Sequence, residues 1–224
     1  MKPGAEAAFK AIEEDAARIC ADLKAPHPHL AIEALTASNG RGAGSPGVKE
    51  VWWLNAFESE AEKQRVYDAY AHNRPLMAAL AGIGTRRQDV IAAEVDVFAN
   101  YRADLSRGAP WTIAGARFFV VTVTTREHQR PRPERGAGGK PGAAGPPSES
   151  ERGWGPASIE NVAVFETSDG THYIFKTVRD RDEADAVAAA AEPQIAIFAV
   201  RPYWGLPAPE WIDADPEFWR PYRV

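Results

Sequence analysis

The sequence is poor in cysteine, has no long apolar run and has no surplus of basic residues. Cys20 is its single cysteine among 224 residues, which excludes an intramolecular disulfide and a zinc site built on cysteines. No apolar run approaches the roughly 20 residues of a membrane-spanning helix, and acidic residues interrupt the N-terminal stretch where a signal peptide would be apolar. Lys and Arg number 26 against 31 Asp and Glu, and this net charge of −5 argues against a nucleic-acid partner.

What the sequence does contain is enough apolar material for a core. Hydrophobic residues make up 45% of the chain, which suits one large or two small domains. We therefore expect a soluble cytoplasmic protein, or a secreted one if its true start lies upstream. The excess of Arg over Lys and the abundance of Ala indicate a bacterial source with a GC-rich genome.

Apolar periodicity predicts helices and strands in mixed order. A three-or-four spacing predicts a first helix over 4–24. Ser59 with Glu62, and Thr85 with Gln88, have the spacing of capping boxes and predict two further helix starts. A short helix is predicted from Asp180 to Ala191. Alternating or β-branched runs predict strands at 29–38, 48–57, 95–102, 116–125, 158–167, 171–178 and 194–200.

The order of these elements repeats, which predicts an α+β fold with two ferredoxin-like (split βαβ) halves. The segment from Val51 to Val66 matches the segment from His172 to Val187, strand on strand and cap on cap. Residues 1–105 form the first half, which lacks its opening strand, and 116–200 form the second, which lacks its first helix. Together they would build one barrel-like body.

Residues 127–157 are filled with Gly, Pro, Ser and charge. They stand where the first helix of the second half should be, so we interpret them as a disordered insertion within a domain, not as a linker. The Pro- and Trp-rich end, 201–224, is predicted to be an extended strap over apolar surface, with Trp211 and Trp219 docking separately. The alternative for this end is a lid or a segment that binds a partner.

Three short motifs carry a resemblance to a known family. Lys2-Pro3-Gly4 precedes an acidic helix, "YRADLS" at 101–106 joins the two halves, and "ADPEFW" stands at 214–219. With these motifs the chain resembles the dimeric α+β barrel superfamily in its tandem single-chain form, and within it an uncharacterised group of bacterial proteins. The resemblance implies a fold but no single reaction, because the superfamily includes haem enzymes such as chlorite dismutases, cofactor-free monooxygenases, cyclases and lactone isomerases.

The candidate site lies on two equivalent strands of the predicted halves. His172 and Lys176 share one face of their strand with Ile174. If that face lined the barrel, an imidazole, an ammonium and a carboxylate would surround an aromatic wall and suit acid–base work on a small substrate. The alternative is that these polar side chains face solvent. The predicted catalytic residues are His172, Lys176 and Glu33, and the predicted binding residues are Trp53, Asn55, Asn161 and Tyr173.

Histidines do not predict a metal site. His27 and His29 stand in "PHPH" without an identifiable third ligand, and structural or catalytic metal sites need at least three protein ligands. His72 lies near a predicted helix end, where an imidazole can meet the last carbonyls. We therefore expect no metal and no cofactor.

The leading functional hypothesis is a small-molecule-binding barrel protein of unknown reaction. The alternatives are a cofactor-free monooxygenase or isomerase/cyclase acting on a small apolar substrate, a haem-binding barrel, and a non-catalytic assembly module whose sheet pairs with a partner. A homodimer is one expected form of association.

Overall fold

The computed structural model of the chain describes residues 1–35, 49–108, 115–125, 161–189 and 195–219. The predicted insertion at 127–157 lies outside the described residues.

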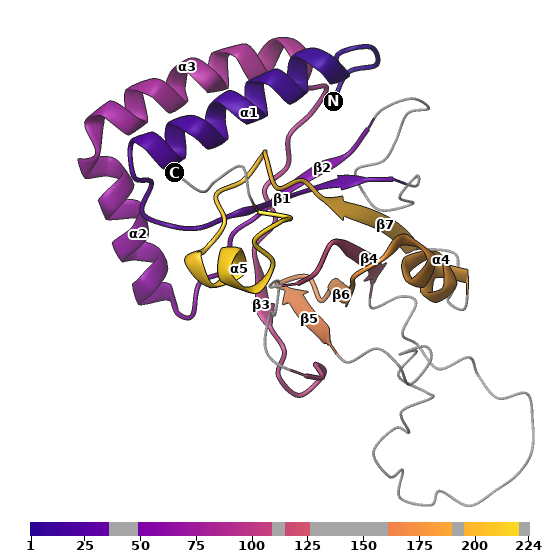
Figure 1. Cartoon of the computed structure of the whole chain (residues 1–224). Helices are drawn as coiled ribbons and strands as arrows, with labels where there is room; N and C mark the ends of the chain where they lie inside the picture. The colour runs from indigo at the N-terminus through magenta and orange to yellow at the C-terminus, as the bar shows by residue number, and fades with distance from the viewer. Residues whose placement is uncertain (36–48, 109–114, 126–160, 190–194, 220–224) are drawn as a thin grey trace, which may run out of the picture.

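The described residues form an α+β fold around a seven-stranded antiparallel sheet with the strand order β2-β1-β7-β4-β6-β5-β3 (Figure 1). Strands β2 and β3 form its two edges. The strands are β1 (Leu30–Ala34), β2 (Val51–Leu54), β3 (Ala99–Tyr101), β4 (Phe118–Thr124), β5 (Val162–Thr167), β6 (His172–Val178) and β7 (Ile195–Val200). The helices are α1 (Glu6–Asp22), α2 (Glu60–His72), α3 (Arg74–Val90), α4 (Arg181–Ala189) and α5 (Pro209–Ala214).

Side-chain caps define the starts of α2 and α4. The Ser59 hydroxyl accepts a hydrogen bond from the Glu62 N–H at 3.1 Å and begins α2, as predicted. The Asp180 carboxylate accepts from the Glu183 N–H at 2.7 Å at the start of α4, also as predicted.

The helix start predicted at Thr85 is wrong. The Asn73 side chain accepts from the Leu76 N–H at 3.3 Å, and with Pro75 in the first turn it begins α3 earlier. Thr85 therefore lies inside α3, where its hydroxyl donates to the Ala81 carbonyl at 3.1 Å. The Thr85 hydroxyl therefore bonds within α3 and does not cap a second helix.

The sheet is curled into a half-barrel, and Trp52 on the edge strand β2 is the clearest evidence. Its ring lies 6.0 Å from that of Tyr173 and 6.1 Å from that of Phe175, both on β6. Strands β2 and β6 are four positions apart in the sheet, which is roughly 19 Å in a flat sheet. Ring contacts across that interval require strong curvature, and they place these aromatic side chains on the concave face.

Apolar side chains and the C-terminal segment fill the concave face. Trp219, which is 1% exposed, packs there with residues of β1, β4, β6 and β7, and Trp211 and Phe218 join it from the same segment. The convex face has two separate cores. One packs the sheet against α1 and α3, which lie side by side, and the other packs it against α4 (Figure 1).

The C-terminal segment differs from the predicted extended strap. It includes the short helix α5, and the chain turns at Asp215, whose φ of −142° is not helical. The turn brings the rings of Trp211 and Trp219 to 5.9 Å, so the prediction that they dock separately is wrong. Upstream, Gly205 passes so close to β1 that an added Cβ would lie 2.5 Å from the His29 carbonyl oxygen, which explains the glycine there.

The strands of the predicted first half do not lie together. β1 and β2 pair at one end of the sheet, whereas β3 pairs with β5 at the other. The division into two ferredoxin-like halves is therefore not confirmed, although the strands of the predicted second half are contiguous in the order β7-β4-β6-β5.

Candidate functional site

The predicted site residues lie mainly on the convex face, in separate clusters. Tyr173 faces the concave side with Trp52. His172 and Lys176 alternate with it and project from the opposite face. Asn55 is exposed beyond the end of β2, and Asn161 is half-buried just before β5, where its carbonyl accepts from the Thr177 N–H at 3.4 Å. The structure therefore brings His172 and Lys176 onto one strand face and keeps them apart from the Glu33 and Trp53 region.

Glu33 is a buried acid paired with cations of neighbouring segments. It is 7% exposed, and its Oε2 accepts from Arg201 Nε at 2.7 Å, while Lys49 Nζ lies 3.9 Å from its Oε1. Arg201 directly follows β7, which pairs with β1. This ion pair connects β1 to the end of β7. Glu33 therefore has a structural role in this contact.

Trp53 belongs to a second buried polar cluster, under α1 and α3. Its indole Nε1 donates to Glu13 Oε2 at 3.0 Å, and the Arg87 guanidinium carbon lies 5.0 Å from the centroid of its ring. Arg87 also donates from Nε and Nη2 to the two oxygens of Glu13, each at 2.7 Å. Glu13 is fully buried. Its charge is thus matched by a bidentate guanidinium and an indole N–H.

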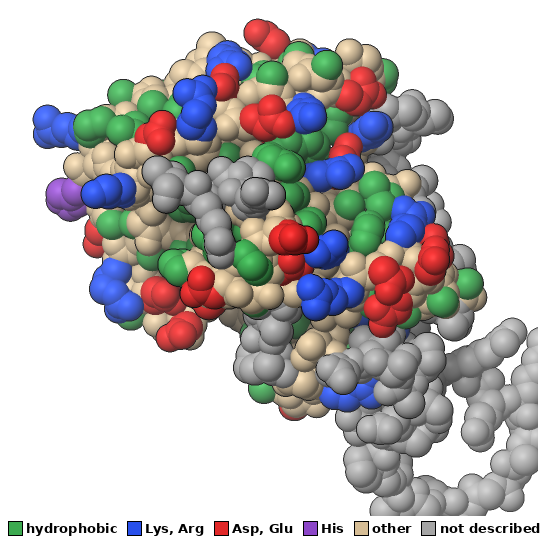
Figure 2. Space-filling view, viewed as in Figure 1, with side chains coloured by type: hydrophobic (Ala, Val, Ile, Leu, Met, Phe, Trp, Pro, Cys, Tyr) green, Lys and Arg blue, Asp and Glu red, His purple; other side chains and the backbone are tan. Residues whose placement is uncertain are grey.

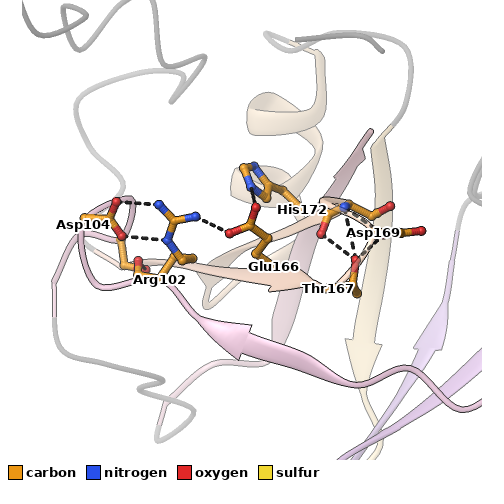
Figure 3. A network of polar contacts seen from close by, with 8 residues as sticks. Arg102, Asp104, Glu166, Thr167, Asp169 and His172 are labelled. Carbon is orange, nitrogen blue, oxygen red and sulfur yellow. Dashed lines mark hydrogen bonds and ion pairs between the residues drawn. The ribbon is translucent and has the colours of Figure 1, made fainter. Parts of the chain in front are cut away.

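His172 takes part in a polar network at the end of the β5–β6 hairpin (Figure 3). Its Nε2 lies 3.4 Å from Glu166 Oε1, and Arg102 donates to Glu166 Oε2 and, at 2.9 and 2.7 Å, to the two oxygens of Asp104. The Arg102 guanidinium holds the pKa values of both Glu166 and Asp104 below their usual ranges, and the hydrogen bond from His172 lowers that of Glu166 further. Both carboxylates are consequently ionised at neutral pH.

The adjoining turn uses the other polar groups of this region. Asp169 accepts from the Thr171 N–H at 3.0 Å and from the Thr167 hydroxyl, which itself accepts from the same N–H at 3.1 Å (Figure 3). Gly170 completes the turn with a φ of +81°, a conformation that favours glycine. These residues fix the hairpin and thereby fix the register that places His172 opposite Glu166.

Sequence reasoning found His172 but missed Arg102 and Glu166. Glu166 could have been predicted from the sequence, because the hairpin turn places it opposite His172. Arg102 lies within the 101–106 motif, which indicates no role for its side chain. Its contact with Glu166 depends on the pairing of β3 with β5, which are more than sixty residues apart in the chain, and no local pattern encodes that pairing.

Lys176 lies in apolar surroundings on the convex face of β6. It is 2% exposed and pairs across the sheet with Val120 and Val162, both buried. Burial lowers the pKa of its ammonium, and the positive charge of Arg107 lowers that pKa further. The neutral form of the Lys176 amine is therefore favoured more than the neutral form of an exposed lysine.

The edge strand β3 is bordered by exposed apolar side chains. Val95, Val97 and Phe98 are 78%, 52% and 69% exposed, and they directly precede Ala99, where β3 begins. Helix α2 lies next to them, with Lys63 Nζ 5.2 Å from the centroid of the Phe98 ring. None of the side chains of α2 is buried, and its Tyr67 is 48% exposed. Large exposed apolar groups gathered at one place commonly mark interaction sites.

The described residues show neither a metal-binding cluster nor a membrane-spanning helix. No cluster of three or more His, Cys, Asp or Glu side chains there could hold a metal ion. No described helix has both the length and the apolarity to cross a membrane. On the face shown in Figure 2, acidic and basic side chains are interspersed.

Comparisons with known proteins add no family to these observations. The chain matches no protein-family model, no curated protein and no solved structure. Functional inference therefore rests on the residues described above.

Proposed function

We propose that this chain is an assembly protein that pairs through the open edge of β3 with the same edge of a second copy. The observation that carries the proposal is the exposure of Val95, Val97 and Phe98 directly before an edge strand. Exposed apolar edges are sites where another strand can add to a sheet. In a symmetric dimer the same edge would serve both copies.

Backbone geometry supplies the hydrogen-bonding groups for this pairing. The Arg102 N–H donates to the Val164 carbonyl at 2.8 Å, so even-numbered residues of β3 direct their backbone groups toward β5. Ala99 and Tyr101 consequently direct theirs away from β5, to the outer edge. An antiparallel partner would accept and donate at these two residues.

The charged residues favour one alignment of β3 with β3 of the second copy over a neighbouring alignment. With Ala99 opposite its own copy, Arg102 lies opposite Asp96, and Tyr101 lies opposite Val97. Of the two neighbouring registers that keep the outward groups paired, one would place Asp104 opposite Asp96, a repulsive pair. The other would place Arg102 opposite Glu94 and so would require pairing to extend further from β3, which begins at Ala99. We therefore propose the Ala99-centred register, which also covers Val97 on each copy.

The dense packing of the concave face favours assembly over small-molecule binding as the function. A barrel that binds a small molecule needs room on its inner face, and here buried aromatic and aliphatic side chains and Trp219 occupy that face. The residues predicted to line one cavity are divided between both faces of the sheet. These features favour the assembly hypothesis among those that the sequence left open.

We also propose that the fold is related to the α+β barrel superfamily. The order β7-β4-β6-β5, with β4 first in the chain, is that of a ferredoxin-like unit with strands numbered 4-1-3-2. This order and the curled sheet support the resemblance for the second half. For the first half the support is the β1–β2 pair and the helices that follow it.

The test is the molar mass of the purified protein in solution, measured by light scattering after size-exclusion chromatography. We expect a dimer for the unaltered chain and a folded monomer for Ala99→Pro, because proline removes an outward N–H and is tolerated on an open edge. Asn100→Pro is the matched control, since it removes an N–H directed at β5 and should destabilise the fold itself. A monomeric unaltered chain, or an Ala99→Pro variant that stays dimeric, would refute the proposal.

A further inference from the structure

Lys63 of α2 lies between two exposed aromatic rings beside the β3 edge. Its Nζ is 5.2 Å from the centroid of the Phe98 ring and 5.9 Å from that of the Tyr67 ring, distances at which a cation is attracted to a ring face. The same ammonium lies 3.1 Å from Glu60 Oε1, one turn earlier in the helix. The Lys63 side chain is 24% exposed, whereas Phe98 is 69% exposed. Phe98 is therefore held by α2 from one side and still offers most of its ring to a partner.

The pairing proposed above places Phe98 next to the two-fold axis of the dimer. Because Ala99 would form a hydrogen-bonded pair with its own copy, Phe98 would lie opposite Asn100 of the second copy in a non-hydrogen-bonded pair, where side chains approach most closely. The second Phe98 is then a diagonal neighbour on the same face, within reach of an aromatic side chain. The neighbouring register with Arg102 opposite Glu94 would set the two Phe98 residues directly opposite each other. The contact between the two rings therefore does not depend on the choice between these two registers.

We propose that the two Phe98 rings form the central contact of the β3-paired dimer and that Lys63 is a positioning residue that holds each ring for this contact. The inference rests on the proposed pairing through β3 and adds the side chain that selects a second copy as the partner. The ring meets an identical ring at the axis only when the added strand is β3 of the same chain.

Three physical effects make this contact important for association. Aromatic residues near the centre of an interface commonly supply most of its binding energy. A pair of rings gains an attraction beyond the area that it buries. A ring that Lys63 already holds in place also loses less side-chain freedom on association than an unrestrained ring would lose.

The dissociation constant of the full-length dimer, measured by sedimentation equilibrium, tests this inference. Phe98→Ala should raise the dissociation constant at least about thirtyfold, the usual effect of truncating a dominant interface residue, while circular dichroism remains that of the folded chain. Val95→Ala is the matched control, because Val95 is 78% exposed in the same run but lies outside the paired residues 97–101. It should change the constant at most about threefold. Equal effects of the two variants would overturn the inference.

Variants of α2 test the positioning role of Lys63 by the same measurement. Lys63→Met keeps the length of the side chain but removes its charge, and it should raise the dissociation constant about two- to fivefold. Lys63→Arg keeps a cation over the ring and should restore the constant of the unaltered chain. Glu60→Gln weakens only the ion pair within α2 and should leave the constant unchanged. If Lys63→Arg weakened the dimer as much as Lys63→Met, the positioning role would be wrong.

The inference and the proposed function can fail separately. If Ala99→Pro is monomeric while Phe98→Ala dimerises as tightly as the unaltered chain, pairing through β3 stands and the Phe98 contact is excluded. If the unaltered chain is itself monomeric, both are refuted.

Discussion

Glu13 shows at the scale of single residues how this fold uses charge. Its carboxylate is fully buried and receives two N–H groups of Arg87 and one of Trp53. Removing one partner of a buried ion pair leaves the other charge without compensation. The cluster therefore holds α1, α3 and β2 together, although the sequence singled out only Trp53 of its residues, and for a binding role.

We expect Arg87→Ala to lower the free energy of unfolding by about 3–5 kcal/mol, the usual cost of breaking a buried pair. The matched control is Arg86→Ala, which removes an exposed pair with Asp15 (2.9 Å) and should cost less than about 1 kcal/mol. Urea denaturation followed by circular dichroism measures both. If both variants lost a similar free energy of unfolding, the burial of Glu13 would not be the reason why its pair with Arg87 is stabilising.

At the scale of elements, local pattern predicted most helices and strands, and tertiary contacts decided the rest. The strands of the β5–β6 hairpin and the caps at Ser59 and Asp180 were predictable because each depends on residues close in sequence. The helix α5 was not, because Pro and Trp in the tail favoured an extended interpretation. The face of each strand was not predictable either, because both faces of β6 carry apolar residues, and only the curl decides which is concave.

The C-terminal segment is predicted to contribute a large part of the stability. Trp219 is 1% exposed within the concave core, and replacing a buried Trp by Ala typically costs about 3–5 kcal/mol. Trp219→Ala should lower the melting temperature sharply, whereas Tyr203→Ala, at a side chain that is 50% exposed, should change stability by under about 0.5 kcal/mol. Calorimetry compares them, and an unchanged melting temperature for Trp219→Ala would mean that the tail is not part of the core.

Acid should weaken the attachment of the same segment. Asp215 is buried, which by itself raises its pKa, but hydrogen bonds from Arg117 and then from Phe218 N–H and Arg179 outweigh burial, and its pKa lies below the usual 3.8. Because the folded pKa is depressed, the stabilisation is complete above the unfolded value and is lost as pH falls through the folded pKa.

The corresponding experiment follows unfolding by tryptophan fluorescence from pH 7 to pH 2. Asp215→Asn should be less stable than the unaltered chain at neutral pH, and the difference should shrink below about pH 4. Asp213→Asn, at an exposed residue of α5, is the control and should follow the unaltered chain. A difference that stayed constant with pH would exclude the charge of Asp215 as its cause.

At the scale of the whole molecule, the half-barrel leaves two sheet edges, and the most exposed large apolar side chains of the described ranges adjoin the β3 edge. Val95, Val97 and Phe98 precede β3, while the β2 residues are all half-buried. The sequence predicted an assembly module as one of several alternatives. It could not show where the partner would bind, because the position of β3 at the edge depends on its pairing with β5.

A disulfide cross-link at Ala99 tests the proposed assembly most directly. In the Ala99-centred register, the two copies of residue 99 form a hydrogen-bonded pair with Cα atoms about 5.5 Å apart, within the range that a disulfide spans. The background is low, because Cys20 is buried and desolvation raises the pKa of its thiol to about 11. After mild oxidation, Ala99→Cys should run as a covalent dimer in non-reducing electrophoresis, and Ala92→Cys, at an exposed residue outside the paired segment, should remain a monomer. If Ala99→Cys also remained a monomer, or if both variants cross-linked equally, pairing through β3 would be contradicted.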